Sequence, residues 1–253
     1  MQKPTPSPPA ADSPPTADNP PTADNPPTAD NPPTADNPTE RILLIACGAL
    51  TREILALKAA NGWEHLALQC LPAQYHNRPE KIPEAVRKTV QQNRGDYAKI
   101  FVVYGDCGTG GRLAATCREL GVEMVEGPHC YSFFEGNAHF AERAKTEITA
   151  FYLTDFLVRQ FDAFVWKPLK LDRHPALRDM YFANYTKLVY QSQTHDPHLL
   201  SKAQDCAARL GLAFEHRHTG YGDLLTTLAR VADTRDAAQA PVPPRLVASA
   251  GRS

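Results

Sequence analysis

The sequence lacks an excess of charge of either sign and lacks any long apolar run. Its 253 residues carry a formal net charge of −1 at pH 7, without the basic surplus typical of proteins that bind nucleic acid or anionic membranes. No stretch is long and apolar enough to span a bilayer. Met1-Gln2-Lys3 runs into prolines without the apolar segment of a secretory signal. We therefore expect a cytoplasmic protein with neither nucleic-acid nor membrane partners.

The first segment lacks aromatic and large aliphatic side chains. From Lys3 to Pro38 the chain repeats a Pro-Pro-Thr-Ala-Asp-Asn unit, which has nothing to bury that would offset the entropy lost on ordering. We expect residues 1–39 to form a disordered, proline-rich arm, and residues 236–253, with Pro241, Pro243 and Pro244, to be a disordered tail. The remaining residues, 40–235, are expected to form a single α/β domain.

Strands and helices alternate through the first half of that domain. The expected strands are short runs of apolar residues and the expected helices follow them, ended by Gly or Asn. Regular alternation of this kind predicts a mainly parallel, doubly wound sheet in a three-layer, Rossmann-like sandwich. The expected strands are Arg41–Ala46, Leu66–Leu71, Ile100–Tyr104 and Val122–Val125, and the helices are Leu50–Ala60, Pro83–Asn93 and Arg112–Leu120.

The second half is expected to be more helical. Asp155 is interpreted as the N-cap of a helix over Asp155–Val165, and Pro175–Tyr190 as one long amphipathic segment. A short helix after Gly222 is expected to close the domain. The remaining expected elements are helices at Ala138–Glu147 and Pro197–Leu210 and strands at Ala150–Leu153 and Leu212–Glu215.

Three of the 6 cysteines follow expected strands. Cys47, Cys107 and Cys130 each stand next to Gly, Asp or His rather than core residues, and right-handed crossovers bring successive strand ends to one edge of a sheet. Cys70, Cys117 and Cys206 lie within elements and are interpreted as small buried hydrophobes. No Cys-x-x-Cys pair is present, so a zinc ribbon or thioredoxin motif is excluded. The sequence predicts that the first three share a site.

Three thiolates are ligands for a soft metal. Catalytic zinc typically has three protein ligands and one open position, and a [4Fe–4S] cluster held by three cysteines leaves one iron open to substrate. Magnesium and calcium prefer oxygen ligands. Zinc and a [4Fe–4S] cluster both remain open at this point.

Acid–base candidates surround the three cysteines in sequence. His76, in the loop after the second strand, is a general base or a further ligand; Asp106 either binds a substrate or caps the glycine-rich turn. Glu135 is a candidate acid, with a solvated loop position as its alternative. Gly108, Gly110 and Gly111 precede a helix and are candidates for binding a phosphate of a cofactor, although the pattern matches neither the dinucleotide fingerprint nor a P-loop.

These residues carry a resemblance to a known family. The segments ACGAL at Ala46–Leu50, YGDCGTGG at Tyr104–Gly111, GPHCY at Gly127–Tyr131 and FYLTDFLVR at Phe151–Arg159 resemble the DUF1638 family, together with the His76-Asn77-x-Pro79-Glu80 segment. The resemblance extends from about Arg41 to Leu225. It implies little about activity, because the family is uncharacterised. It does imply an accessory role beside corrinoid-dependent methyl transfer, with a methyltransferase as partner.

The pattern favours a small metal-dependent enzyme. A zinc or iron–sulfur centre on the three cysteines would activate a small-molecule substrate for thiol, amine or methyl transfer. Two alternatives stay open at the level of the sequence. One is a non-catalytic accessory protein that binds a metal or small ligand, and the other is a metal-free enzyme with Cys107 as nucleophile.

Overall fold

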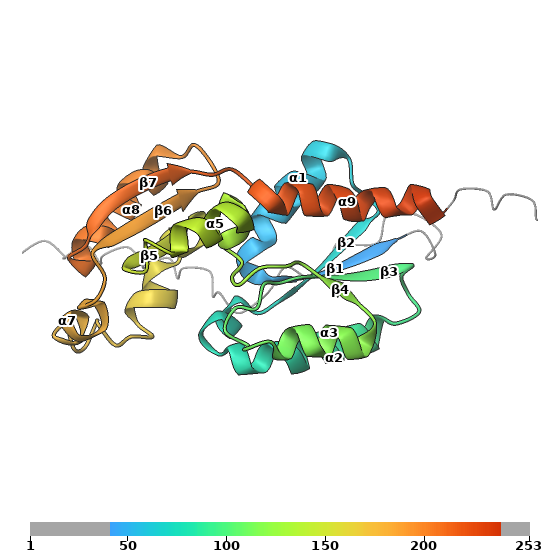
Figure 1. Ribbon diagram of the computed structural model, residues 1–253, viewed down its shortest axis with the longest axis horizontal. Coiled ribbons are helices and arrows are strands. Elements are labelled where there is room, and N and C mark those ends of the chain that lie inside the picture. Colours follow the sequence, from blue (N-terminus) through green and yellow to red (C-terminus); the bar gives the residue numbers. More distant parts are fainter. Residues whose placement is uncertain (1–40, 239–253) are drawn as a thin grey trace, which may run out of the picture.

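The computed structural model describes residues 41–238, with the side chains of residues 234–238 left out. The expected proline-rich arm and most of the expected tail lie outside these residues. The described chain forms two lobes, each built on its own parallel sheet, and the lobes lie side by side (Figure 1). Within the described chain no helix has the length and apolarity needed to cross a membrane.

The first lobe contains a four-stranded parallel sheet in the order β2-β1-β3-β4. All residues of β1 are buried, because it lies between β2 and β3 and is covered on both faces. Helices α2 and α3 lie on one face of this sheet and α1 and α9 on the other (Figure 1). The elements are β1 Ile42–Cys47, α1 Thr51–Asn61, β2 Leu66–Leu71, α2 Ile82–Asn93, β3 Lys99–Val103, α3 Arg112–Leu120, β4 Glu123–Met124 and α9 Gly222–Ala238.

The second lobe contains a three-stranded parallel sheet in the order β5-β6-β7 with a separate hydrophobic core. A π-helical turn at Asp162–Trp166 follows α6. The elements are α5 Asn137–Ala144, β5 Ala150–Thr154, α6 Asp155–Arg159, α7 Leu177–Phe182, β6 Lys187–Ser192, α8 Pro197–Leu210 and β7 Ala213–His218.

The chain crosses between the lobes twice, and the two crossings are joined. It leaves the first lobe through α4, Ser132–Glu135, and returns into α9 at Gly222. The carboxylate of Asp223 accepts a hydrogen bond of 2.7 Å from the backbone N–H of Asn137, which starts α5. Helices α4 and α9 are also in contact. The two segments that connect the lobes therefore pack against each other.

The α/β class and the parallel strands predicted from the sequence are confirmed. The strands nevertheless divide between two sheets, and three further expectations are wrong. The segment Pro175–Tyr190 contains the short helix α7 and most of strand β6 instead of one amphipathic helix. Thr154, not Asp155, caps α6, which ends at Arg159. The closing helix α9 has 17 residues and is not short.

Candidate functional site

The loops after β3 and β4 are held against each other by backbone hydrogen bonds. The N–H of Asp106 donates to the carbonyl of Gly127 and that of Cys107 to the carbonyl of Pro128, both at 2.9 Å. The approach requires glycine at position 105, because a Cβ there would lie 2.9 Å from the carbonyl carbon of His129. This contact between the two loops sets the position of Cys107 relative to Cys130.

The three predicted cysteines meet at the carboxyl edge of the first sheet. The sulfur atoms of Cys107 and Cys130 lie 3.2 Å apart. Cys47, which is 5 % exposed at the end of β1, is close enough to Cys130 for each thiol to shift the pKa of the other. Cys107 adopts a positive φ of 47°, which turns the chain immediately after β3. The structure therefore brings together all three side chains for which a shared site was expected.

The electrostatics of the cluster follow from this contact. The hydrogen bond from Cys130 lowers the pKa of Cys47 despite the opposing effect of burial. Its two thiol neighbours and burial together raise the pKa of Cys130 well above its ordinary value. The Tyr104 hydroxyl is buried beside Cys47 and makes no hydrogen bond of good geometry with the described residues. Of the cysteines in this cluster, Cys47 is thus the one favoured as the thiolate, and the hydroxyl of Tyr104 beside it can donate a hydrogen bond.

A cavity of about 350 Å³ opens directly over the sulfur atoms. Its wall is shared by the two lobes, since the second lobe contributes the start of α6. The lining consists of Cys47, Ala49, Leu50, His76, Pro79, Cys107, Gly108, His129, Cys130, Tyr131, Phe134, Thr154, Phe156 and Leu157.

Two histidines lie in the cavity wall. His76, expected in the loop after the second strand, comes from the 3-10 turn Ala73–Asn77, and His129 precedes Cys130. Burial lowers the pKa of both imidazoles, and for His76 the proximity of His129 lowers the pKa further. Both rings are therefore neutral near pH 7 and each has a nitrogen able to accept a proton. His129 stacks on Tyr131 with ring centroids 4.8 Å apart, which fixes the orientation of its ring.

Asp106 caps the glycine-rich turn instead of entering the cavity lining. Its carboxylate accepts hydrogen bonds from the Thr109 hydroxyl at 2.7 Å and from the backbone N–H groups of Gly111 and Gly110 at 2.6 and 3.0 Å. Burial is the largest single effect and raises the pKa of Asp106, but the three hydrogen bonds together outweigh it, so the pKa is lowered. The N–H groups expected to hold a phosphate at Gly110 and Gly111 are occupied by this side chain. Gly108 lines the cavity but Gly110 and Gly111 do not.

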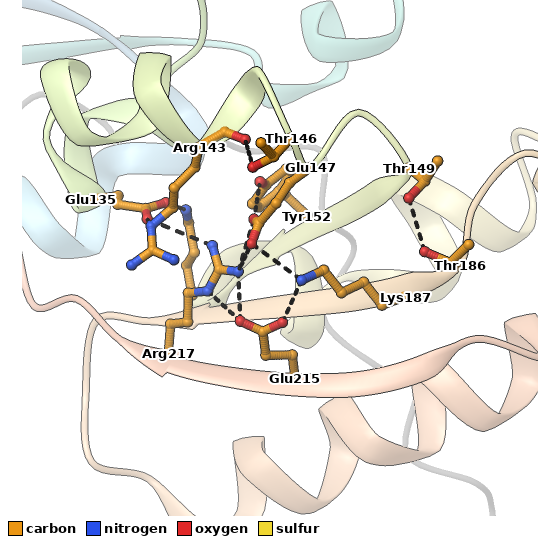
Figure 2. A network of polar contacts seen from close by, with 11 residues as sticks. Glu135, Arg143, Thr146, Glu147, Thr149, Tyr152, Thr186, Lys187, Glu215 and Arg217 are labelled. Carbon is orange, nitrogen blue, oxygen red and sulfur yellow. Dashed lines mark hydrogen bonds and ion pairs between the residues drawn. The ribbon is translucent and has the colours of Figure 1, made fainter.

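Glu135 belongs to a network of charges between the lobes (Figure 2). It forms an ion pair with Arg143 and accepts a hydrogen bond of 2.9 Å from Gln191 on β6. Arg217 on β7 joins the same network, with two hydrogen bonds of 2.8 Å to Glu147. The expected acid at position 135 is therefore outside the cavity lining and links α4 to the second sheet.

Several lining residues had no signal in the sequence. Phe156 and Leu157 come from the second lobe and reach the cavity only because the lobes pack together. Tyr131 directly follows Cys130, so its place in the lining could have been predicted from that cysteine. Among the residues that the structure describes, no group of three or more His, Cys, Asp or Glu side chains has an arrangement that could hold a metal ion.

The fold and the site define a two-lobed, parallel α/β protein with a cysteine cluster in a cavity between its lobes. The chain belongs to the family described as "Protein of unknown function (DUF1638)", whose model matches residues 70–228. No significant match was found among curated proteins.

One solved structure shows a weak likeness. It is an ornithine carbamoyltransferase from Pyrococcus furiosus, with 16 % sequence identity over 70 % of this chain. The present chain covers 54 % of that protein, and the TM-score is 0.24. Such a score carries no argument about function.

Proposed function

We propose that this protein is a small metal-dependent enzyme in which Cys47, Cys107 and Cys130 hold a zinc ion and a small-molecule substrate reacts in the cavity above it. The observation that carries the proposal is the meeting of three sulfur atoms, from the end of β1 and from the loops after β3 and β4, beneath one cavity. Three protein ligands and an open position are typical of catalytic zinc. We place the protein in the reducing cytoplasm, where thiols remain available as ligands.

The spacing of the sulfur atoms favours a single ion over a cluster. Zinc–sulfur bonds of about 2.3 Å at tetrahedral angles place sulfur ligands roughly 3.8 Å apart. Cysteines around a [4Fe–4S] cluster are farther apart, on the order of 6–7 Å. The 3.2 Å between Cys107 and Cys130 is a thiol–thiol contact, so the two side chains need to separate only slightly to bind zinc.

The surrounding residues fit a thiolate-bound ion. The unpartnered Tyr104 hydroxyl beside Cys47 supplies a donor for a thiolate, and such outer partners orient and tune metal ligands. Cys47 is buried, whereas Cys107 and Cys130 are partly buried and line the cavity. Three thiolates this close together require a cation to remain ionised, because their mutual repulsion otherwise restores protons.

The remaining residues of the cavity act on the substrate. Bound zinc would supply Lewis-acid activation of a thiol or water. A ring nitrogen of His76 accepts the proton released from that group, since burial keeps its imidazole neutral. Phe134, Phe156 and Leu157 pack against the organic part of the substrate and exclude water. This placement of a proton acceptor in the wall favours catalysis over the alternative of a metal carrier.

The test is the metal content of protein purified without oxygen. We expect close to one zinc per chain, and a large loss in each of Cys47→Ser, Cys107→Ser and Cys130→Ser. Cys117→Ser and Cys206→Ser are matched controls, because these buried thiols lie on α3 and α8 away from the cavity lining. Equal metal content in Cys107→Ser and the parent would remove the metal-dependent function and leave the metal-free cysteine nucleophile.

A further inference from the structure

The cavity over the cysteines is lined without formally charged side chains. None of its described lining residues is Asp, Glu, Lys or Arg. Apart from the cysteines, its polar side chains are those of His76, His129, Tyr131 and Thr154. The rest of the wall consists of Gly, Ala, Leu, Pro and Phe. A ligand in this cavity therefore meets hydrogen-bonding groups and apolar surface, but no counter-ion.

The acids that neighbour the lining residues in sequence are engaged elsewhere. Asp106, beside Cys107, is used by the glycine-rich turn. Asp155, beside Thr154 and Phe156, is fully buried and accepts hydrogen bonds from Tyr190 at 2.7 Å and Thr194 at 2.5 Å. Neither carboxylate is free to bind a cation that enters the cavity.

Charge is therefore a selection criterion at this site. A carboxylate or phosphate group that enters the cavity loses its hydration without gaining an opposite charge from the lining. A divalent ion on three thiolates carries a net charge of −1 by simple addition, which repels an anion further. An uncharged ligand pays neither penalty and gains contact with Phe156 and Leu157.

We propose that the ligand is a small molecule without an anionic group and with a soft donor atom, namely a neutral thiol or thioether. This proposal rests on the three-cysteine centre proposed above and names its substrate class. A cavity of about 350 Å³ lies at the lower end of the range for small-molecule sites, so the ligand is a short organic molecule. The sulfur faces the cysteine cluster and the alkyl part packs against the wall supplied by the second lobe.

The experiment compares three short thiols on the full-length protein under anaerobic conditions. The probes are 1-propanethiol, which is neutral, cysteamine, which carries an ammonium group, and mercaptoacetate, which carries a carboxylate. Binding is measured by calorimetry, and cobalt(II) loading is followed in parallel by its thiolate charge-transfer absorption. We expect 1-propanethiol to bind at least about tenfold more tightly than mercaptoacetate, and cysteamine to be disfavoured less than mercaptoacetate.

A pair of variants at one position isolates the effect of charge. Phe156 lines the cavity and packs edge-on against Phe164, with ring centroids 5.0 Å apart. Phe156→Lys should shift the preference toward mercaptoacetate by about tenfold, and Phe156→Leu should leave the order of the probes unchanged. Circular dichroism establishes that both variants are folded.

The outcomes separate the two proposals. Binding of mercaptoacetate to the parent as tightly as 1-propanethiol overturns the proposed substrate class, as does an unchanged order of probes in a folded Phe156→Lys variant. If cobalt fails to bind but calorimetry still shows the preference for the neutral probe, the substrate class stands and the three-cysteine metal centre falls.

Discussion

The sulfur atoms of Cys107 and Cys130 lie 3.2 Å apart although the two residues are 23 positions apart in the chain. This distance is longer than a disulfide bond of about 2.05 Å and shorter than the roughly 3.8 Å between thiolates on one zinc ion. The sulfur–sulfur distance therefore lies between the value for an oxidised pair and the value for a metal-bound pair. The contact depends on Gly105, where the loops after β3 and β4 approach most closely.

Oxidation of the metal-free protein should link this pair. Glutathione disulfide should convert the two thiols to a Cys107–Cys130 disulfide, releasing two protons and two electrons that reduce the oxidant to two glutathione molecules. Peptide mapping by mass spectrometry checks the linkage. Prior loading with zinc should slow the reaction, because the ligated thiolates are then unavailable. Predominant pairing of Cys47 with Cys130 would contradict the geometry of the cluster.

The positions of Cys47 and Cys107 could be predicted because they depend on the local sequence. Each follows or ends an apolar run that forms a parallel strand, and the carboxyl ends of parallel strands lie at one edge of the sheet. The position of Glu135 depends instead on packing between distant parts of the chain. Glu135 is tied to Gln191 on β6 and to the charges around Arg217 on β7, and neither partner is indicated by the local sequence. The strand Lys187–Ser192 was not predicted, because the spacing of Tyr181, Tyr185 and Tyr190 also fits a helix.

Replacement of Arg217 should strongly destabilise the second lobe. The Arg217 side chain is 11 % exposed and pairs with Glu147 and Glu215, which are partly buried. In Arg217→Met these carboxylates keep only Lys187 as a cation. We expect a loss of about 2 kcal/mol in the free energy of unfolding, measured with urea. Lys145→Met is the control, because its exposed pair with Glu142 is worth less than about 1 kcal/mol. Similar losses in both variants would show that the network contributes little.

Glu53 should make the stability depend on pH. It is 5 % exposed, its Oε2 atom has no hydrogen-bond partner among the described residues, and burial raises its pKa, with a smaller contribution from Asp155. Since the folded carboxyl binds its proton more tightly than the unfolded one, stability is lost as pH rises from the ordinary pKa through the raised one.

The variant Glu53→Gln should remove that dependence. Its stability relative to the parent should increase between about pH 4.5 and pH 8, reaching on the order of 1 kcal/mol, in urea unfolding at each pH. Glu84→Gln, at a position 80 % exposed in its side chain, should show no such trend. A constant difference between Glu53→Gln and the parent over this range would be evidence against the buried carboxyl.

The return crossing should tolerate no side chain at Gly222. Its φ is +45°, and a Cβ there would collide with the backbone carbonyl oxygens of Phe133 and Phe134 in α4. We expect Gly222→Ala to lower the free energy of unfolding by about 2–3 kcal/mol. Gly110→Ala should cost about 1 kcal/mol, because its φ of +63° is strained for alanine but the space is open. Thermal unfolding by calorimetry compares the two, and equal costs would contradict the close packing of α4 against α9.

The central claim is that one metal ion is bound by the sulfur atoms of Cys47, Cys107 and Cys130. The most direct measurement is zinc K-edge X-ray absorption on the full chain purified without oxygen. The account predicts three sulfur neighbours at about 2.3 Å and one lighter ligand atom, with the sulfur count reduced in Cys107→Ser and unchanged in Cys206→Ser. A zinc shell of nitrogen and oxygen alone, or a spectrum that is identical in Cys107→Ser, would contradict it.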